Sequence, residues 1–114
     1  MYISVDCTST NYANKIATAC VEKVMEFYGN SIGLHILEVD VSFKDLYPHL
    51  GWCEEEYYGC YKLDLDLSLL HNKEELILTV CHEAIHIAQH LTDGTYDEEE
   101  AYGYERTFAR MVKL

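Results

Sequence analysis

The spacing of apolar residues in the first quarter of the chain predicts a strand followed by a helix. Residues 2–7 alternate and include β-branched side chains, which is typical of a short strand. From residue 13 to residue 28 the apolar positions recur every three or four residues instead, which predicts a long amphipathic helix that Gly29 ends. The Thr-Ser-Thr segment at 8–10 provides its N-terminal cap. The predicted core-facing stripe consists of Ala13, Ile16, Ala17, Cys20, Val21, Val24, Phe27 and Tyr28.

Two later segments also alternate and predict two further strands. They span residues 34–43 and residues 57–67, each with one apolar face and one polar face. Residues 47–52, which contain the single proline of the chain, break the pattern and predict a loop. The three glutamates at 54–56 are interpreted as a solvated surface. The two apolar faces consist of Leu37, Val39, Val41 and Phe43, and of Tyr61, Leu63, Leu65 and Leu67.

The third periodic segment predicts a helix that begins after Asn72 and ends at Gly94. Asn72 is the N-cap, with Glu75 three residues later, and Gly94 is the stop signal. At about 100° per residue, its polar side chains occupy roughly a third of the circumference. We therefore expect an embedded helix whose polar stripe faces a cleft. The stripe consists of Glu75, Thr79, His82, Glu83, His86, Gln89 and His90.

Part of this stripe is an H-E-x-x-H sequence formed by His82, Glu83 and His86. Residues four apart lie one above the other on a helix, so both imidazoles can reach one cation. Glu83 would then lie beside the metal, where it can accept a proton from a metal-bound water. His90 is eight residues from His82, or about 12 Å along a continuous helix, so one cation cannot bind both. The alternative interpretation is that the stripe is only a solvated face.

Residues 95–112 predict a final helix, capped by Thr95. Its apolar face consists of Ala101, Phe108 and Val112. By helical spacing, Glu98 and Glu105 share this face. A carboxylate on the core side of a helix is costly unless it binds a cation or a hydrogen-bond donor. The spacing therefore favours a metal-binding role for a carboxylate of this helix.

Several carboxylates compete for the role of third metal ligand, and Glu98 is the favoured one. Its alternative role is a capping box, in which Glu98 bonds back to the amide of Thr95. Glu105 is the second candidate, and its alternative is an exposed pair with a nearby arginine. Glu99 and Glu100 remain candidates, although the helical spacing directs them away from the buried face.

The H-E-x-x-H segment resembles the active-site helix of the zincin metallopeptidases. It departs from the metzincin subtype, because Gln89 stands where metzincins have a glycine. It is more similar to gluzincins, which take a glutamate from a following helix. The Glu98-x-x-Ala101 pattern is similar to the ImmA/IrrE group and to small phage-type zincins, although Tyr102 stands where ImmA/IrrE proteins have an asparagine. The resemblance covers about residues 57–112.

This resemblance implies the fold class. We expect a compact α+β zincin-like domain, with a long N-terminal helix, a small mixed β-sheet and the H-E-x-x-H helix followed by a ligand-bearing helix. A length of 114 residues predicts a single domain over 1–114. In zincins the strand before the active-site helix lines the cleft and can pair with an extended peptide. The resemblance assigns that task here to the strand over 57–67.

The resemblance also implies the chemistry, that of a zinc-dependent peptidase acting on a peptide or protein substrate. Glu83 would be the general base, and Zn²⁺ would keep an open fourth position for water. Tyr102 and Tyr104 are the nearest tyrosines in sequence that could assist the oxyanion. The three implied metal ligands are His82, His86 and Glu98.

Composition excludes several other classes of function. The formal charge of −12 argues against nucleic-acid binding, because a phosphate backbone would be repelled. No run of 18 apolar residues exists, and residues 1–6 lack the features of an export signal, so we expect no membrane association. Five cysteines without paired spacing predict reduced thiols and a cytoplasmic protein. Cys53 and Cys60 are a weaker candidate for a second metal site. The oligomeric state is not defined by these features.

Two alternative functions remain open at this stage. The first is a non-catalytic zincin-like binding or inhibitory module with structural zinc, against which the intact Glu83 argues. The second is an acidic decoy of a nucleic-acid-binding protein, which the net charge allows. The histidines outside the motif are interpreted as exposed or structural, except His90, which is interpreted as supporting the metal ligands or lining the cleft. The other three are His35, His49 and His71.

Overall fold

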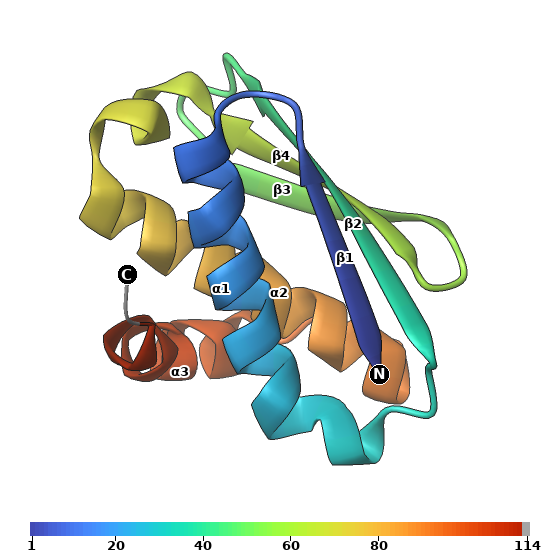
Figure 1. Cartoon of the computed structure of the whole chain (residues 1–114). Helices are drawn as coiled ribbons and strands as arrows, with labels where there is room; N and C mark the ends of the chain where they lie inside the picture. The colour runs from blue at the N-terminus through green and yellow to red at the C-terminus, as the bar shows by residue number, and fades with distance from the viewer. Residues whose placement is uncertain (113–114) are drawn as a thin grey trace.

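The computed structural model describes residues 1–112 of the chain. Within this range the chain forms four strands and three α-helices in an α+β arrangement (Figure 1). In chain order these are β1 (Tyr2–Cys7), α1 (Asn11–Tyr28), β2 (Ile36–Lys44), β3 (Gly51–Tyr57), β4 (Cys60–Asp66), α2 (Lys73–Asp93) and α3 (Glu98–Met111). Short 3₁₀ segments follow α1 and β4.

The four strands form one mixed sheet in the order β1-β2-β4-β3. The first three strands in this order are parallel, whereas β3 is antiparallel to β4 and forms an edge. A tight turn joins β3 to β4, and Gly59 in this turn has a left-handed φ of 83°, which glycine adopts without steric cost. The hairpin leaves β3 next to α2. The edge of the sheet therefore lies beside the helix that carries the H-E-x-x-H sequence.

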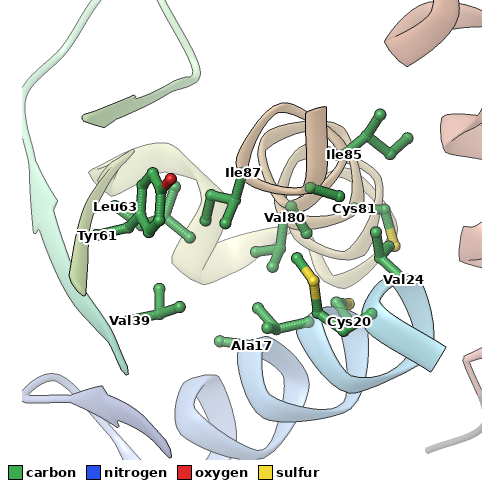
Figure 2. Close-up of a cluster of buried hydrophobic side chains, with 14 of the residues drawn as sticks. Ala17, Cys20, Val24, Val39, Tyr61, Leu63, Val80, Cys81, Ile85 and Ile87 are labelled. Carbon is green, nitrogen blue, oxygen red and sulfur yellow. The ribbon is translucent and has the colours of Figure 1, made fainter. Parts of the chain in front are cut away.

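The three α-helices lie on one face of the sheet, and the core fills the space between them (Figure 1). Figure 2 shows Val39 and Leu63 from the sheet directed toward Ile87 of α2 and Ala17 of α1. The alternation of β2 and β4 produces this arrangement, because every second side chain points to the helices. The fully buried side chains of these two strands are Leu37, Val39, Val41, Tyr61, Leu63 and Leu65.

Helix α2 occupies the centre of the molecule and packs against α1, α3 and β3. Burying one Val, Leu or Ile side chain contributes roughly 1.5–3 kcal/mol, so the several buried side chains of α2 hold the helix firmly in place. Cys81 of α2 faces Cys20 of α1, and their contact together with burial raises the pKa of the Cys20 thiol. Within residues 1–112, no helix combines the length and the apolar character that a membrane crossing requires. The fully buried apolar residues of α2 are Val80, Cys81, Ala84, Ile85, Ile87 and Ala88.

Several predicted boundaries are confirmed together with their physical cause. The strand at 2–7 matches β1. The Oγ1 of Thr10 accepts a hydrogen bond from the amide of Ala13 at 3.0 Å and caps α1. The Oδ1 of Asn72 accepts from the amide of Glu75 at 3.2 Å, and Gly94 ends α2 in the left-handed conformation. Local capping chemistry therefore specified three of these helix ends.

The predicted strand over 57–67 is wrong at both ends. Tyr57 belongs to β3, the turn follows it, and β4 begins at Cys60. Leu67 is 47% exposed and begins the 3₁₀ segment that separates β4 from α2. The predicted loop over 47–52 also ends early, because Gly51 starts β3. The alternation of apolar and polar residues did not indicate β3, because an edge strand with three exposed glutamates lacks a continuous apolar face.

Two further expectations about the helices are corrected. Phe27 was predicted to lie on the buried stripe of α1, but its side chain is 63% exposed and covers the edge of Phe108 at a ring separation of 5.5 Å. Thr95 was predicted to cap the last helix, but the cap of α3 is Asp97, whose Oδ1 accepts from the amide of Glu100 at 3.1 Å. Thr95 instead donates its hydroxyl to Asp93.

Candidate metal centre

The predicted polar stripe of α2 faces a pocket of about 740 Å³ along most of its length, but its last two residues, Gln89 and His90, do not line this pocket. One wall is α2 itself, and the opposite walls are the segment 48–53 of β3 and its preceding loop, the residue Tyr96, and α3. The motif residues on this wall are buried although they are polar, with exposed fractions between 5% and 8%. Buried polar groups are costly unless they are paired, so this wall needs partners. The three residues are His82, Glu83 and His86.

The partner that reaches both imidazoles is Glu98. Its Oε1 lies 3.3 Å from Nε2 of His82 and also contacts Nε2 of His86. The three potential ligand atoms all lie within 4.8 Å of one another, and the two rings are 4.8 Å apart at 84°. A divalent cation prefers such a set of imidazole nitrogens and a carboxylate oxygen. The residues present therefore fit a zinc ion.

Glu98 reaches this position from the first residue of α3 and not from its buried face. Its side chain is 60% exposed, so it covers the site from the solvent side. The alternative role for Glu98, a capping box with Thr95, is not formed, because Asp93 accepts from the amide of Thr95. The structure thus brings the three predicted ligands together. Glu98 points toward α2, as the helical spacing predicted, but its side chain is exposed and not buried.

Glu105 takes a different place in the site. Its side chain is 13% exposed, and its Oε2 lies 3.9 Å from Nδ1 of His82. This nitrogen is buried and has no hydrogen-bond partner in the described part of the chain. Burial raises the pKa of Glu105, and the nearby His82 opposes this shift. Glu105 therefore faces the outer nitrogen of the imidazole, which suits orientation of His82 more than ligation.

The two remaining glutamates of this helix differ. Glu99 is exposed and outside the cluster of potential ligands. Glu100 was expected to point away from the core, but its Oε1 accepts a hydrogen bond from Nε2 of Gln89 at 2.7 Å. It therefore fixes α3 to α2 without approaching the two imidazoles.

Glu83 lies between the two histidines at the bottom of the pocket. Burial raises the pKa of its carboxyl, whereas the neighbouring imidazoles lower it. Gly51 of β3 packs directly on it, since a Cβ there would lie 3.1 Å from Cγ of Glu83 and 2.9 Å from Cγ2 of Thr79. The Sγ of Cys53 donates to the carbonyl of Glu83 at 3.8 Å. Gly51 therefore confines the side chain of Glu83, and among residues 1–112 no arginine or lysine pairs with its carboxylate.

The two tyrosines named from the sequence differ in their position relative to the pocket. Tyr102 lines the pocket with its ring 4.6 Å from that of His82, whereas Tyr104 is not among the described residues that line it. The sequence analysis missed Tyr96, whose ring lies 5.4 Å from that of His86. Burial, followed by the nearby Cys53 and Glu55, raises the pKa of Tyr96. No local signal marks this residue, because it belongs to the turn between α2 and α3.

The other histidines and cysteines lie outside the centre. His90, which was expected to line the cleft, is not among the described residues that line the pocket; it shares a hydrogen bond of 2.5 Å with the hydroxyl of Tyr61 and stacks on Tyr96. His35 and His71 are exposed, and His49 lines the pocket. All five cysteines, which lie within residues 1–112, are unpaired. The predicted Cys53–Cys60 metal pair is not formed, since Cys53 faces α2 while Cys60 lies with Asp40 and Glu56.

Comparison of the chain with protein-family models, with curated protein sequences and with solved structures finds no match. The functional argument therefore depends on the geometry of the site.

Proposed function

We propose that this chain is a zinc-dependent peptidase of the small gluzincin type. The observation that carries the proposal is the convergence of His82, His86 and Glu98 around one point at the edge of a pocket. A second carboxylate, Glu83, lies beside this point, and among residues 1–112 no lysine or arginine pairs with it. A site for structural zinc is closed by four protein ligands, whereas a catalytic site has three and an open position. Three ligands, an open pocket and an adjacent base fit the second kind.

Each residue has a separate task in the proposed reaction. Zinc bound by the three ligands would supply a Lewis acid that polarises a peptide carbonyl and lowers the pKa of water. Glu83 accepts the proton of the attacking water at its carboxylate and passes it to the leaving amine. The raised pKa that burial gives Glu83 makes it a better proton acceptor than an exposed carboxylate. Tyr102 and Tyr96 offer hydroxyl groups at the rim of the same pocket.

The substrate is proposed to be an extended peptide that pairs with β3. The strand assigned to this task from the sequence, over 57–67, corresponds mainly to β4, and β4 lies inside the sheet with both edges occupied. Strand β3 is one of the two edge strands, and unlike β1 its first residues line the pocket. Backbone pairing at a free edge aligns a peptide without fixing its sequence. The proposed peptide-pairing strand is therefore β3 and not the strand predicted over 57–67, while the physical basis, backbone pairing at a sheet edge, is the same.

The deciding experiment measures zinc and hydrolysis on the same preparations. We expect about one zinc per chain in the wild type by elemental analysis, and hydrolysis of a quenched fluorescent peptide library that a chelator abolishes. His86→Ala should lose the metal and the activity, whereas His90→Ala should keep the metal. Equal metal loss in both variants would refute the ligand assignment. Full zinc without any hydrolysis would instead favour the non-catalytic binding module.

A further inference from the structure

The side chain of Gln89 connects the two helices that carry the candidate ligands. It lies on α2 one turn after His86 and is 6% exposed. Its Oε1 lies 2.9 Å from Nδ1 of His86 and also accepts from the amide of Asp97 at 2.9 Å. Its Nε2 donates to the carbonyl of Asp97 at 3.0 Å and to Glu100 at 2.7 Å. Both ends of the amide are thus fully used.

These contacts fix the orientation of the amide and the tautomer of His86. Rotating the amide by 180° would place its NH₂ group against the amide N–H of Asp97, and its oxygen against the carboxylate of Glu100. The first contact would place two donors together and the second two acceptors, so the amide is not rotated and Oε1 faces His86. Nδ1 of His86 therefore carries the hydrogen and donates it. In the neutral ring, Nε2 then has the lone pair, and this lone pair points toward Glu98.

The same side chain holds the start of α3. Asp97 is the N-cap of this helix, and its carbonyl accepts from the amide of Ala101 at 3.1 Å. Gln89 bonds to both the N–H and the carbonyl of Asp97, as a neighbouring strand would. Glu98 is the next residue in the chain. The position of its backbone therefore depends on Gln89, although the two side chains do not need to touch.

We propose that Gln89 is a positioning residue of the metal centre, which orients His86 and presents Glu98 through the turn before α3. The inference deepens the proposed function and rests on it for the identity of the cation. Two ligands from separate helices then depend on one buried amide. It follows that binding of the metal and ordering of the first turn of α3 are coupled.

Two substitutions separate the two halves of this role. Gln89→Met keeps the length of the side chain and removes all its hydrogen bonds. Gln89→Glu keeps an acceptor for Nδ1–H of His86 but loses the donor to Asp97 and places a carboxylate against Glu100. Thr92→Val is the matched control, because Thr92 lies on the same helix and bonds only to the carbonyl of Ala88. The two readouts are zinc affinity by competition with a chromophoric chelator, and amide hydrogen exchange of the metal-free protein.

We expect Gln89→Met to weaken zinc binding by about 10–100-fold, the usual effect of removing the partner of a metal-binding histidine. Exchange at the amides of Glu100 and Ala101 should accelerate. Gln89→Glu should lose less zinc affinity, because His86 keeps its acceptor, while exchange at the same amides accelerates as much. Thr92→Val should change neither.

The proposal is overturned if Gln89→Met binds zinc as tightly as Thr92→Val. Equal loss of affinity in Gln89→Met and Gln89→Glu would show that the orientation of His86 is not involved. Unchanged exchange in Gln89→Glu would refute the link to α3, and this arm decides if Gln89→Met fails to fold by circular dichroism. A wild type that binds no zinc would refute the proposed function, while the exchange experiment would still test the link between the helices.

Discussion

Glu83 and Glu98 line the same pocket, but their surroundings differ, and we propose different tasks for them. Glu83 is buried between two imidazoles, whereas Glu98 is 60% exposed and contacts Nε2 of both. We expect Glu83→Gln to keep zinc and lose hydrolysis by roughly 100-fold or more, the scale of a positioned general base. Glu98→Gln should weaken zinc retention, because an amide is a poorer ligand than a carboxylate. Elemental analysis and peptide hydrolysis of both variants check these outcomes.

The opposite result for this pair would reassign the roles. If Glu83→Gln loses zinc and Glu98→Gln keeps it, the ligand must be sought at Glu105, which already lies 3.9 Å from Nδ1 of His82.

Gly51 provides a second test at the scale of one residue. A methyl group there would lie 2.9 Å from Cγ2 of Thr79 and 3.1 Å from Cγ of Glu83, so β3 or these two side chains must shift. We expect Gly51→Ala to lower hydrolysis by roughly 10–100-fold at unchanged zinc content, since small misplacements of a reacting group are costly. Gly33→Ala is the control, because a methyl group there meets no atom within 4 Å. Equal activity in the two variants would show that Glu83 is not confined by β3.

At the scale of secondary structure, the position of Glu98 depends on where α3 begins. Asp97 caps the helix, so Glu98 is its first residue and projects toward α2. A cap at Thr95 would have made Glu98 the third helical residue, with its side chain bonded back to the amide of Thr95. Moving the N-cap by two residues, from Thr95 to Asp97, therefore decides whether the Glu98 side chain bonds to its own chain or is free to approach the two imidazoles.

This assignment of the cap can be tested without any metal. Asp97→Ala should destabilise the protein by about 1 kcal/mol, as the loss of a capping carboxylate does. Thr95→Ala should cost less, since its hydroxyl bonds only to Asp93 in an exposed turn. Urea unfolding followed by circular dichroism measures both. A larger loss in Thr95→Ala would restore the capping box as the start of the helix.

At the scale of the whole molecule, the candidate ligands join two helices that are otherwise held by few apolar contacts. Only Ala101 and Phe108 of α3 are buried apolar residues among those described. A metal bound by His82, His86 and Glu98 would therefore tie α3 to the core. A ligand that binds only the folded state adds about 2.7 kcal/mol at a free concentration of one hundred times its dissociation constant.

We accordingly expect a chelator to lower the midpoint of thermal unfolding by about 10 °C in zinc-loaded wild type. In His86→Ala the chelator should have no effect, because the variant has no metal to lose. Differential scanning fluorimetry measures both. A chelator effect of the same size in His86→Ala would place the stabilising metal elsewhere, for instance at Asp40, Glu56 and Cys60, the other described group with metal-ligand geometry.

The sequence by itself determined the features that depend on neighbours along the chain. The caps at Thr10, Asn72 and Gly94 act within one turn, so residue identity defines those helix ends. The four-residue spacing of His82 and His86 places both rings on one side of α2 for the same reason. The wide apolar arc around that helix predicted correctly that it is embedded.

Only the tertiary structure decided which groups meet across the pocket. Glu98, and not Glu105, lies within reach of both Nε2 atoms because α3 begins after its cap Asp97, whose backbone is bonded to Gln89 of α2. The edge strand β3 was hidden in the sequence because its exposed face is charged, and pairing with β4 defines it. Tyr96 lies in the turn between α2 and α3, and this places its ring next to that of His86. Spacing along one helix is a local property, whereas convergence of separate elements depends on packing, which no single segment encodes.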